Sequence, residues 1–272
     1  MSHTPLAFIG GGNMASALIG GLVRSGHPPA ALVVVEPHAP QREKLRSEFG
    51  VQALEAVQPE ALRAASVVVW AVKPQSFAEA AQPCRGAVSQ ALHVSVMAGI
   101  RSGTIAAATG ARRIVRAMPN TPALIGRGIA GLHAQPEVGA DERQLVERLL
   151  APTGSVLWID REEQLDAVTA VSGSGPAYVF YVLEAMMQAG VELGLTEADA
   201  RQLAQATFDG AAALATASPL HPRELRAQVT SKGGTTAAAV AVLDAHAVQA
   251  AFVAALKAAQ HRAAEMADQL GR

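Results

Sequence analysis

The chain has 272 residues, of which half are hydrophobic and 4% aromatic, enough for one large domain or two modest ones packed mainly through Ala, Val and Leu. Its net charge of −1 gives no sign of a nucleic acid or an anionic membrane surface as a partner. The single cysteine, Cys84, excludes an internal disulfide, and the first residues lack the pattern of a signal peptide, so we expect a cytoplasmic protein.

A glycine-rich segment follows the first apolar run of the chain. Leu6–Ile9 has the pattern of a strand, a helical pattern follows through Leu22, and a G-x-G-x-x-A motif lies between them. In a dinucleotide-binding turn, the first glycine permits the tight turn, the second lets the backbone approach a pyrophosphate, and the small last residue allows close helix–strand contact. The residues predicted to bind a cofactor in this segment are Gly10, Gly11, Gly12, Asn13, Met14 and Ala15.

Glu36 ends the second predicted strand, Leu32–Glu36, and lies 26 residues after Gly10. A carboxylate at this place binds the ribose 2′-hydroxyl of NAD and repels the 2′-phosphate of NADP. From position alone, a solvated carboxylate at a strand end is an equally good interpretation, and His38 and Arg42 just beyond it are able to moderate the repulsion. We therefore expect NADH to be accepted and leave NADPH open.

Strand and helix patterns continue to alternate up to Asp160, as in a doubly wound βαβ domain. The further predicted strands are Val67–Val72, Leu92–Met97, Arg113–Met118, Ile129–Leu132 and Val156–Ile159, and the predicted helices between strands are Pro40–Phe49 and Asp141–Leu150. Because ligands bind beyond the carboxyl ends of the strands in such a sheet, three strand ends are expected at the cofactor. The predicted cofactor-binding residues there are Ala71, Val72, Lys73, Pro74, Met97, Ala98 and Asn120. Lys73 also fits a solvated loop lysine, and Asn120 also fits a residue that only holds the turn between two prolines.

After Asp160 the strand pattern gives way to helices. We expect helices at Glu162–Val171, from Pro176 to about Gly194, and from a cap at Thr196 to about Ala217. A short helix at about Arg223–Val229 is expected next, and after the turn at residues 229–236 a final helix runs nearly to the end of the chain. The predicted fold is therefore α/β. A Rossmann-type, doubly wound, mainly parallel sheet occupies residues 1–160, and an all-helical domain occupies residues 161–272.

Two adjacent glycines, Gly233 and Gly234, interrupt a helix-favouring stretch, and Thr235 or Thr236 is expected to cap the helix that continues through Phe252. The N–H groups of such a turn at the positive end of a helix suit a small carboxylate, although an ordinary loop fits the stretch equally well. The Ala-rich helix is too polar for a membrane span. Its apolar surface over residues 237–256 predicts an obligate homodimer.

Together these motifs resemble the pyrroline-5-carboxylate reductase family over nearly the whole chain. The resemblance rests on five segments, which are Phe8–Ala15, Ala71–Gln75, Met118–Pro122, Ser172–Tyr178 and Val229–Thr236, the last being the most specific. One departure is Lys232, where many members carry proline. The lysine is expected to change the stiffness of the turn and to add positive charge near the substrate carboxylate.

The resemblance implies NADPH- or NADH-dependent hydride transfer to the C=N bond of 1-pyrroline-5-carboxylate, giving L-proline in the last step of proline biosynthesis. It also implies a dimer of interleaved C-terminal helices, with rings of dimers common in the family. By this resemblance the substrate carboxylate is held around Ser231, Gly233, Gly234 and Thr235, and Thr236 is the catalytic residue whose hydroxyl meets the imine nitrogen. A protonated imine is already electrophilic, so positioning and a hydrogen bond suffice, and no metal is expected.

Two other classes of protein fit parts of the sequence. A β-hydroxyacid-type dehydrogenase shares the two-domain pattern but requires a catalytic lysine on a helix facing the nicotinamide, and the only lysines after Asp160 are Lys232 and Lys257. A dinucleotide sensor without turnover requires the glycine motif but has no use for the turn at 229–236. Proline-dependent reduction of NAD⁺ at alkaline pH distinguishes the sensor from the reductase.

Overall fold

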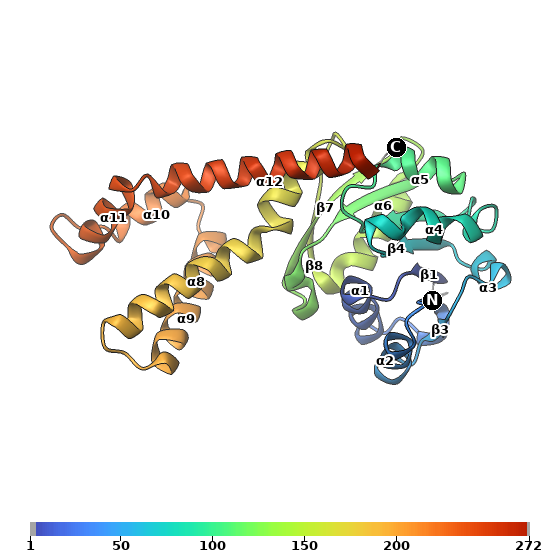
Figure 1. The fold of residues 1–272 in the computed structure, drawn as a ribbon, viewed down its shortest axis with the longest axis horizontal. Helices are drawn as coiled ribbons and strands as arrows, with labels where there is room; N and C mark the ends of the chain where they lie inside the picture. The colour runs from blue at the N-terminus through green and yellow to red at the C-terminus, as the bar shows by residue number, and fades with distance from the viewer. Residues whose placement is uncertain (1–3, 271–272) are drawn as a thin grey trace. The chain divides into compact units, whose positions relative to one another are not determined.

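The computed structural model describes residues 4–270 (Figure 1). Its strands are β1 (Leu6–Ile9), β2 (Leu32–Val35), β3 (Gln52–Leu54), β4 (Val67–Trp70), β5 (Leu92–Ser95), β6 (Ile114–Met118), β7 (Gly128–Ala134) and β8 (Gly154–Trp158). Its α-helices are α1 (Asn13–Arg24), α2 (Ala39–Phe49), α3 (Pro59–Arg63), α4 (Phe77–Ala81), α5 (Ser102–Thr109), α6 (Ala140–Leu150), α7 (Gln164–Val168), α8 (Gly175–Glu192), α9 (Glu197–Ala217), α10 (Pro222–Gln228), α11 (Thr235–Ala245) and α12 (Val248–Leu270). Short 3-10 helices are η1 (Pro29–Ala31), η2 (Pro74–Ser76), η3 (Gln82–Cys84), η4 (Thr121–Ile125) and η5 (Ala151–Thr153), and a π-helix, η6, spans Thr169–Gly173.

The described strands form one eight-stranded sheet in the order β3-β2-β1-β4-β5-β6-β7-β8. Strands β1 to β6 are parallel, whereas β7 pairs antiparallel with β6 and parallel with β8. The chain reverses its direction across the sheet between β1 and β4, which is the place where ligands bind in doubly wound folds. The predicted mainly parallel Rossmann-type sheet is confirmed.

The sheet is covered on both faces, because alternate residues of its strands pack into two separate cores. In β1, Leu6 and Phe8 belong to one core and Ala7 and Ile9 to the other, and all four are at most 2% exposed. The first core includes buried residues of α1, α2 and α6, and the second includes residues of α3, α4 and α5. Continuous apolar strands are therefore required here, as the sequence predicted.

A polar pair is enclosed in the second core. The indole N–H of Trp70 on β4 donates to Nδ1 of His93 on β5 at 2.9 Å, and the other ring nitrogen of His93 lies 2.9 Å from the carbonyl oxygen of Val88. Both side chains are fully buried, and Trp70 also forms a T-shaped pair with Phe77, with ring centroids 5.2 Å apart. Burial lowers the pKa of His93, with the nearby charge of Arg113 acting in the same direction against the Val88 hydrogen bond, so the ring is held neutral.

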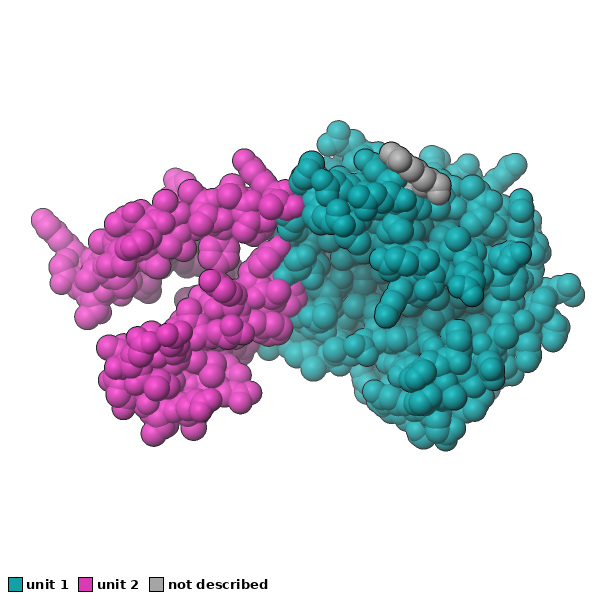
Figure 2. All heavy atoms as spheres, viewed as in Figure 1, with its two compact units in different colours: residues 1–174, 259–272 teal, residues 175–258 magenta. Residues whose placement is uncertain are grey.

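Two compact units divide the chain, residues 1–174 with 259–272 and residues 175–258 (Figure 2). The first unit therefore includes α7, η6 and the last turns of α12, which the sequence analysis assigned to the helical domain beginning at residue 161. The physical reason is packing on the sheet domain: Leu165 of α7 is 1% exposed, and the backbone of Ala267 lies 3.6 Å from the Cβ position of Gly99.

The second unit is all-helical and begins with the helix pair α8 and α9. Gly190 of α8 allows close contact, because a Cβ there would lie 2.8 Å from the Cβ of Ala200 on α9. The side chain of Thr196 accepts a hydrogen bond from the backbone N–H of Asp199 and so caps α9, as predicted from the sequence.

The final helix is not continuous, contrary to the sequence prediction. Helix α11 ends at Ala245, and α12 begins at Val248, with a bend of 52° between them. Ala247 has a φ of 51°, a left-handed conformation that interrupts the helical hydrogen bonds. In the described part of the chain no single helix has the length and apolarity of a membrane span, although α11 and α12 pass that test as a bent pair.

Candidate functional site

The glycine turn after β1 has the conformation that its sequence requires. Gly10 has a φ of +98°, and a Cβ at this position would lie 2.6 Å from the carbonyl oxygen of Ala71, so only glycine fits between β1 and β4. A Cβ at Gly11 would lie 2.6 Å from the side chain of Leu45 on α2. Gly12, in contrast, has no atom within 4 Å of its Cβ position, so its surface is open to a ligand.

Helix α1 begins directly after this open glycine. Gly12 is its N-cap and offers no side-chain bond to the first N–H groups, which remain suited to an anion at the positive end of a 12-residue helix. Asn13 is exposed and Met14 half-buried, whereas Ala15 is fully buried in the core under the sheet. Of these three residues, Ala15 sets the helix–strand contact, Met14 packs against the edge of the same core, and neither Asn13 nor Met14 lines the cavity described below.

A cavity of about 520 Å³ opens at the carboxyl ends of β1, β2, β3 and β4, all within the first unit. This volume is in the range of ligand sites. Of the predicted cofactor-binding residues, those that line the cavity are Gly10, Gly12, Glu36, Ala71, Val72 and Lys73. The cavity wall and the uncovered position at Gly12 fit the pyrophosphate and adenosine part of a dinucleotide.

Glu36 is fixed by two backbone hydrogen bonds. Its Oε2 accepts from the N–H of Gly11 and its Oε1 from the N–H of His38, each at 2.9 Å. The carboxylate therefore joins the end of β2 to the glycine turn and also lines the cavity. It does not simply point into solvent, although each oxygen retains a lone pair for a further donor.

The remaining predicted cofactor residues lie at other strand ends. Pro74 begins η2 directly after the cavity-lining Lys73, and Met97 and Ala98 follow β5. Met97 is 3% exposed and packs into the second core, so it offers backbone rather than side chain to a ligand, while Ala98 is half-buried. The structure does not bring Pro74, Met97 or Ala98 into the wall of the cavity.

Asn120 has a structural role in this conformation. Its amide nitrogen donates to the carbonyl oxygen of Ser172 at 3.2 Å, and its amide oxygen accepts from the N–H of Ile129 at 3.0 Å. It thereby joins the turn after β6 to β7 and to η6. The sequence analysis allowed for this turn-holding role, and a direct contact with a cofactor stays a prediction.

The Gly-Gly turn belongs to the second unit, whereas the residues that line the cavity belong to the first. Gly233 has a φ of +75°, and the N–H of Gly234 donates to the carbonyl oxygen of Ser231 at 3.1 Å, which closes the turn before α11. Ser231, Gly233 and Thr235 are exposed, and Gly234 and Thr236 are half-buried.

The prediction that Thr235 or Thr236 caps α11 is wrong. Gly234 is the N-cap, with φ −80° and ψ 170°, and no side chain caps the helix. The extended conformation that a cap requires is reached at the second glycine, so both threonines already belong to the first helical turn. The first N–H groups of this 11-residue helix are therefore left for water or an anion.

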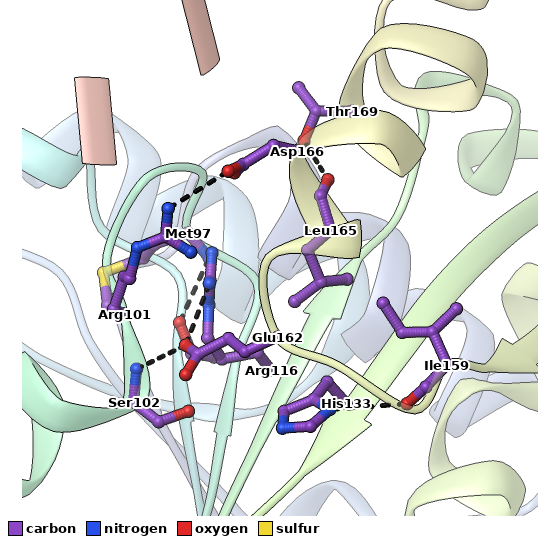
Figure 3. A network of polar contacts seen from close by, with 11 residues as sticks. Met97, Arg101, Ser102, Arg116, His133, Ile159, Glu162, Leu165, Asp166 and Thr169 are labelled. Carbon is purple, nitrogen blue, oxygen red and sulfur yellow. Dashed lines mark hydrogen bonds and ion pairs between the residues drawn. The ribbon is translucent and has the colours of Figure 1, made fainter. Parts of the chain in front are cut away.

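A buried polar network holds the loop after β5 to the segment after β8, as Figure 3 shows. Oε1 of Glu162 accepts from the N–H of Ser102 at 2.7 Å and from Arg116 at 3.0 Å, and Asp166 pairs with Arg101 at 3.1 Å. Burial opposes the charge on Glu162, but the hydrogen bond from Ser102 and the charge of Arg116 outweigh it and hold its pKa below the ordinary value. The network fixes the start of α5, and with it the loop that carries Ala98.

Sequence reasoning missed these five network residues and part of the cavity wall. Arg116 and Glu162 lie 46 positions apart in the sequence, and no local sequence motif connects them. Glu55, Ala56 and Val57 line the cavity because they follow β3, a three-residue strand too short for a periodic signal. The rule that ligands bind at strand ends would have found them had β3 been recognised.

The chain is similar to known protein families and to curated relatives over its whole length. Residues 162–266 match the family model described as "Pyrroline-5-carboxylate reductase dimerisation", and residues 5–99 match "NADP oxidoreductase coenzyme F420-dependent". The chain is 45% identical over 274 aligned residues to the pyrroline-5-carboxylate reductase of Pseudomonas aeruginosa, covering 100% of both, and 42% identical to that of Haemophilus influenzae, covering 98% of both.

Solved structures agree with these relatives. A pyrroline-5-carboxylate reductase from Coxiella burnetii has a TM-score of 0.90 at 35% identity, covering 97% of this chain and 99% of that one. The pyrroline carboxylate reductase of Plasmodium falciparum, solved with NADP bound, has a TM-score of 0.88 at 26% identity, covering 98% and 99%. The helical region is the dimerisation domain of this family. This chain belongs to the pyrroline-5-carboxylate reductase family.

Proposed function

We propose that this protein reduces 1-pyrroline-5-carboxylate to L-proline with NADH or NADPH, as the last step of proline biosynthesis. Hydride passes from nicotinamide C4 to the carbon of the C=N bond, the nitrogen keeps the proton of the imine cation, and the oxidised cofactor leaves. The observation that carries the proposal is the full-length similarity to pyrroline-5-carboxylate reductases at 45% identity in a chain with an open glycine turn beside a ligand-sized cavity.

The cofactor is assigned to the first unit. In the proposal its pyrophosphate lies over Gly12 and the start of α1, where a Cβ would have no neighbour and the helix supplies uncapped N–H groups. The backbone at Met97 and Ala98 and the turn at Asn120 lie at the ends of β5 and β6, on the same edge of the parallel sheet. This edge is the expected place of the nicotinamide, because β5 and β6 lie on the opposite side of β1 from Glu36.

The substrate carboxylate is assigned to the turn before α11. Its donors are the backbone N–H groups of Thr235 and Thr236, which no side chain caps and which lie at the positive end of the helix. Thr236 is half-buried and supplies a hydroxyl for the imine nitrogen in this proposal. Because a protonated imine is electrophilic, the site requires no strong general acid and no metal.

Steady-state kinetics of Thr236→Val test this assignment, because the change keeps the shape and removes the hydroxyl. We expect kcat to fall roughly tenfold or more, as for the loss of one hydrogen bond worth ~1.5 kcal/mol in the transition state. Thr235→Val is the matched control, an adjacent and exposed threonine, and should keep near-normal kinetics. Equal kinetics for wild type and Thr236→Val would place the imine elsewhere.

Gly234 is a poor position for such a test. A Cβ there would lie 2.6 Å from Oγ of Ser231, so a substitution disturbs the turn itself as well as any bound carboxylate. Gly233 has free space around its Cβ position but a φ of +75°, which side chains disfavour. The hydroxyl of Thr236 is therefore the sharper probe of the two.

The proposal extends to the state of the protein in the cell. We infer a homodimer, with rings of dimers as the larger assembly, acting in the cytoplasm on a small-molecule substrate without nucleic acid or membrane. The dimerisation model over residues 162–266 supports the dimer. The net charge of −1 supports a small-molecule rather than a polyanionic partner.

A further inference from the structure

Two carboxylates lie at adjacent strand ends in the wall of the cavity. Glu36 follows β2 and Glu55 follows β3, strands that pair in parallel with Val35 beside Leu54. The N–H of Glu36 also donates to the carbonyl oxygen of Leu54 at 2.9 Å, which ties the two strand ends together. This edge of the sheet is where a doubly wound fold holds the adenosine ribose.

We propose that this constellation selects NADH over NADPH: Glu36 accepts the ribose hydroxyls, and Glu55 withholds Arg42 from any 2′-phosphate. The inference rests on the proposed dinucleotide-dependent function and names the cofactor class that the cavity takes.

Glu36 is oriented before any ligand arrives. Its oxygens are held by the N–H groups of Gly11 and His38, and each has one lone pair left. Two fixed acceptors match two ribose hydroxyls, which are donors. A 2′-phosphate carries between one and two negative charges at neutral pH, so the same carboxylate repels it.

Arg42, the basic residue that contacts Glu36, already has hydrogen-bond and ion-pair partners within the protein. Its NH1 donates to the carbonyl oxygens of Glu36 and Pro37, at 3.0 and 2.5 Å, and its NH2 pairs with Oε2 of Glu55 at 3.0 Å. Its side chain is only 11% exposed. Turning towards a phosphate would cost these three interactions, so Arg42 acts as a positioning residue for the backbone at Glu36 rather than as a phosphate ligand.

The other positive groups lie elsewhere. His38 is exposed and meets Glu36 through its backbone N–H rather than through its ring. Lys73 lines the cavity but follows β4, two strands away from β2, a separation of about 10 Å at ordinary strand spacing. The cavity wall carries Glu36, Glu55 and Glu79 against Lys73, a balance that disfavours an extra phosphate.

Binding titrations with NADH and with NADPH, followed by calorimetry in the absence of substrate, test the proposal. We expect wild type to bind NADH at least about tenfold more tightly than NADPH, as for one unscreened like-charge contact. Glu55→Gln should strengthen NADPH binding by roughly several-fold and leave NADH binding nearly unchanged, because Arg42 then loses its ion pair and keeps only its two backbone acceptors. Adding Arg42→Gln to Glu55→Gln should remove that gain.

The controls separate charge from folding. Glu60→Gln removes an exposed carboxylate on α3 outside the cavity wall and should leave both affinities unchanged. Glu36→Gln keeps an acceptor for Gly11 and should weaken the preference for NADH. Unfolding temperatures of all variants show whether each retains the fold.

Two results would overturn the proposal. One is wild type binding NADPH as tightly as NADH, and the other is a Glu55→Gln protein with the wild-type ratio of affinities. Because binding is measured without substrate, selective NADH binding without turnover of pyrroline-5-carboxylate would contradict the proposed function and leave the cofactor selection standing.

Discussion

The three glycines of the first turn differ in what they do, although the sequence presents them as one motif. Gly10 is glycine because the backbone of Ala71 leaves no room for a Cβ, and a Cβ at Gly11 would press on the end of the Leu45 side chain. Gly12 has open space instead. The fold therefore does not require glycine at this position, and we expect that a bound cofactor does.

Gly12→Val should consequently lose the cofactor and keep the fold. We expect the dissociation constant for NADH to rise by roughly 100-fold or more, because the side chain occupies the place of the pyrophosphate. The unfolding temperature without cofactor should stay close to that of wild type. Gly10→Val is the contrasting variant, since its Cβ would collide with the backbone at Ala71 and unfold the sheet domain.

An unchanged NADH affinity in Gly12→Val would remove the glycine turn from the cofactor site. Calorimetric titration of the purified variant, after circular dichroism has shown a native spectrum, provides the measurement.

His93 makes the stability of the sheet domain depend on pH. Burial lowers its pKa in the folded protein, whereas the unfolded chain takes up the proton at about pH 6.5. Below that pH the unfolded state binds more protons, so the free energy of unfolding falls as pH falls, by at most about 1.4 kcal/mol per pH unit from this group. Protonation would also remove the acceptor for the indole N–H of Trp70.

Denaturant unfolding of wild type and His93→Gln, between about pH 8 and pH 5.5, isolates this contribution from the other histidines. His93→Gln should be less stable at the higher pH and should lose less stability on acidification. Parallel curves for the two proteins would mean that His93 titrates normally.

At the scale of elements, the longer strands and helices could be predicted because buried elements of this length show continuous or periodic runs of apolar residues. The strand β4 and the helix α9 with its Thr196 cap are examples. The strand β3 could not be predicted, because three residues are too few to show a periodic pattern. For the same reason the position of Glu55, directly after β3, was not recognised as part of the cavity wall. The network of Arg116 and Glu162 depends on a tertiary contact that no local pattern encodes.

The break between α11 and α12 was missed for a different reason. Alanine has the best helix propensity, so the segment around Ala247 has the sequence of an uninterrupted helix. In the structure Ala247 has a φ of 51°, which an L-residue with a Cβ reaches only at a cost of roughly 1 kcal/mol. Tertiary context overrides propensity here.

Ala247→Gly should therefore leave stability unchanged or raise it by up to about 1 kcal/mol, as glycine accepts the left-handed conformation freely. Ala241→Gly, in the interior of α11, should lower stability by about 1 kcal/mol and is the matched control. Urea unfolding at one protein concentration compares the two. Equal destabilisation by both substitutions would mean that the helix runs through Ala247 in solution.

For the whole molecule, the second unit gives the clearest sign of assembly. Fifteen large apolar side chains of residues 175–258 are exposed, among them Phe180, Leu193, Leu214, Val242 and Val253. So much exposed apolar surface on one small helical unit is the mark of an interface, and this region matches the dimerisation model of the family.

Ala250→Glu or Ala254→Glu should disrupt the dimer, because a charge then replaces a small residue on an exposed α12 surface within the region that matches the dimerisation model. We expect monomers or aggregates by light scattering at micromolar concentration. Ala39→Glu, the same change at an exposed position of α2 in the first unit, should remain dimeric. A stable monomeric wild type would contradict the expectation directly.

The central claim is hydride transfer from a nicotinamide to the C=N carbon of pyrroline-5-carboxylate, and isotope transfer measures it most directly. The purified protein is incubated with the substrate and NADH deuterated twice at nicotinamide C4, and the product is analysed by mass spectrometry and NMR. The account predicts L-proline with one deuterium at the ring carbon bonded to nitrogen, Cδ, formed in equal amount to the NAD⁺ released. Proline without deuterium, or oxidation of NADH without any proline, would contradict it.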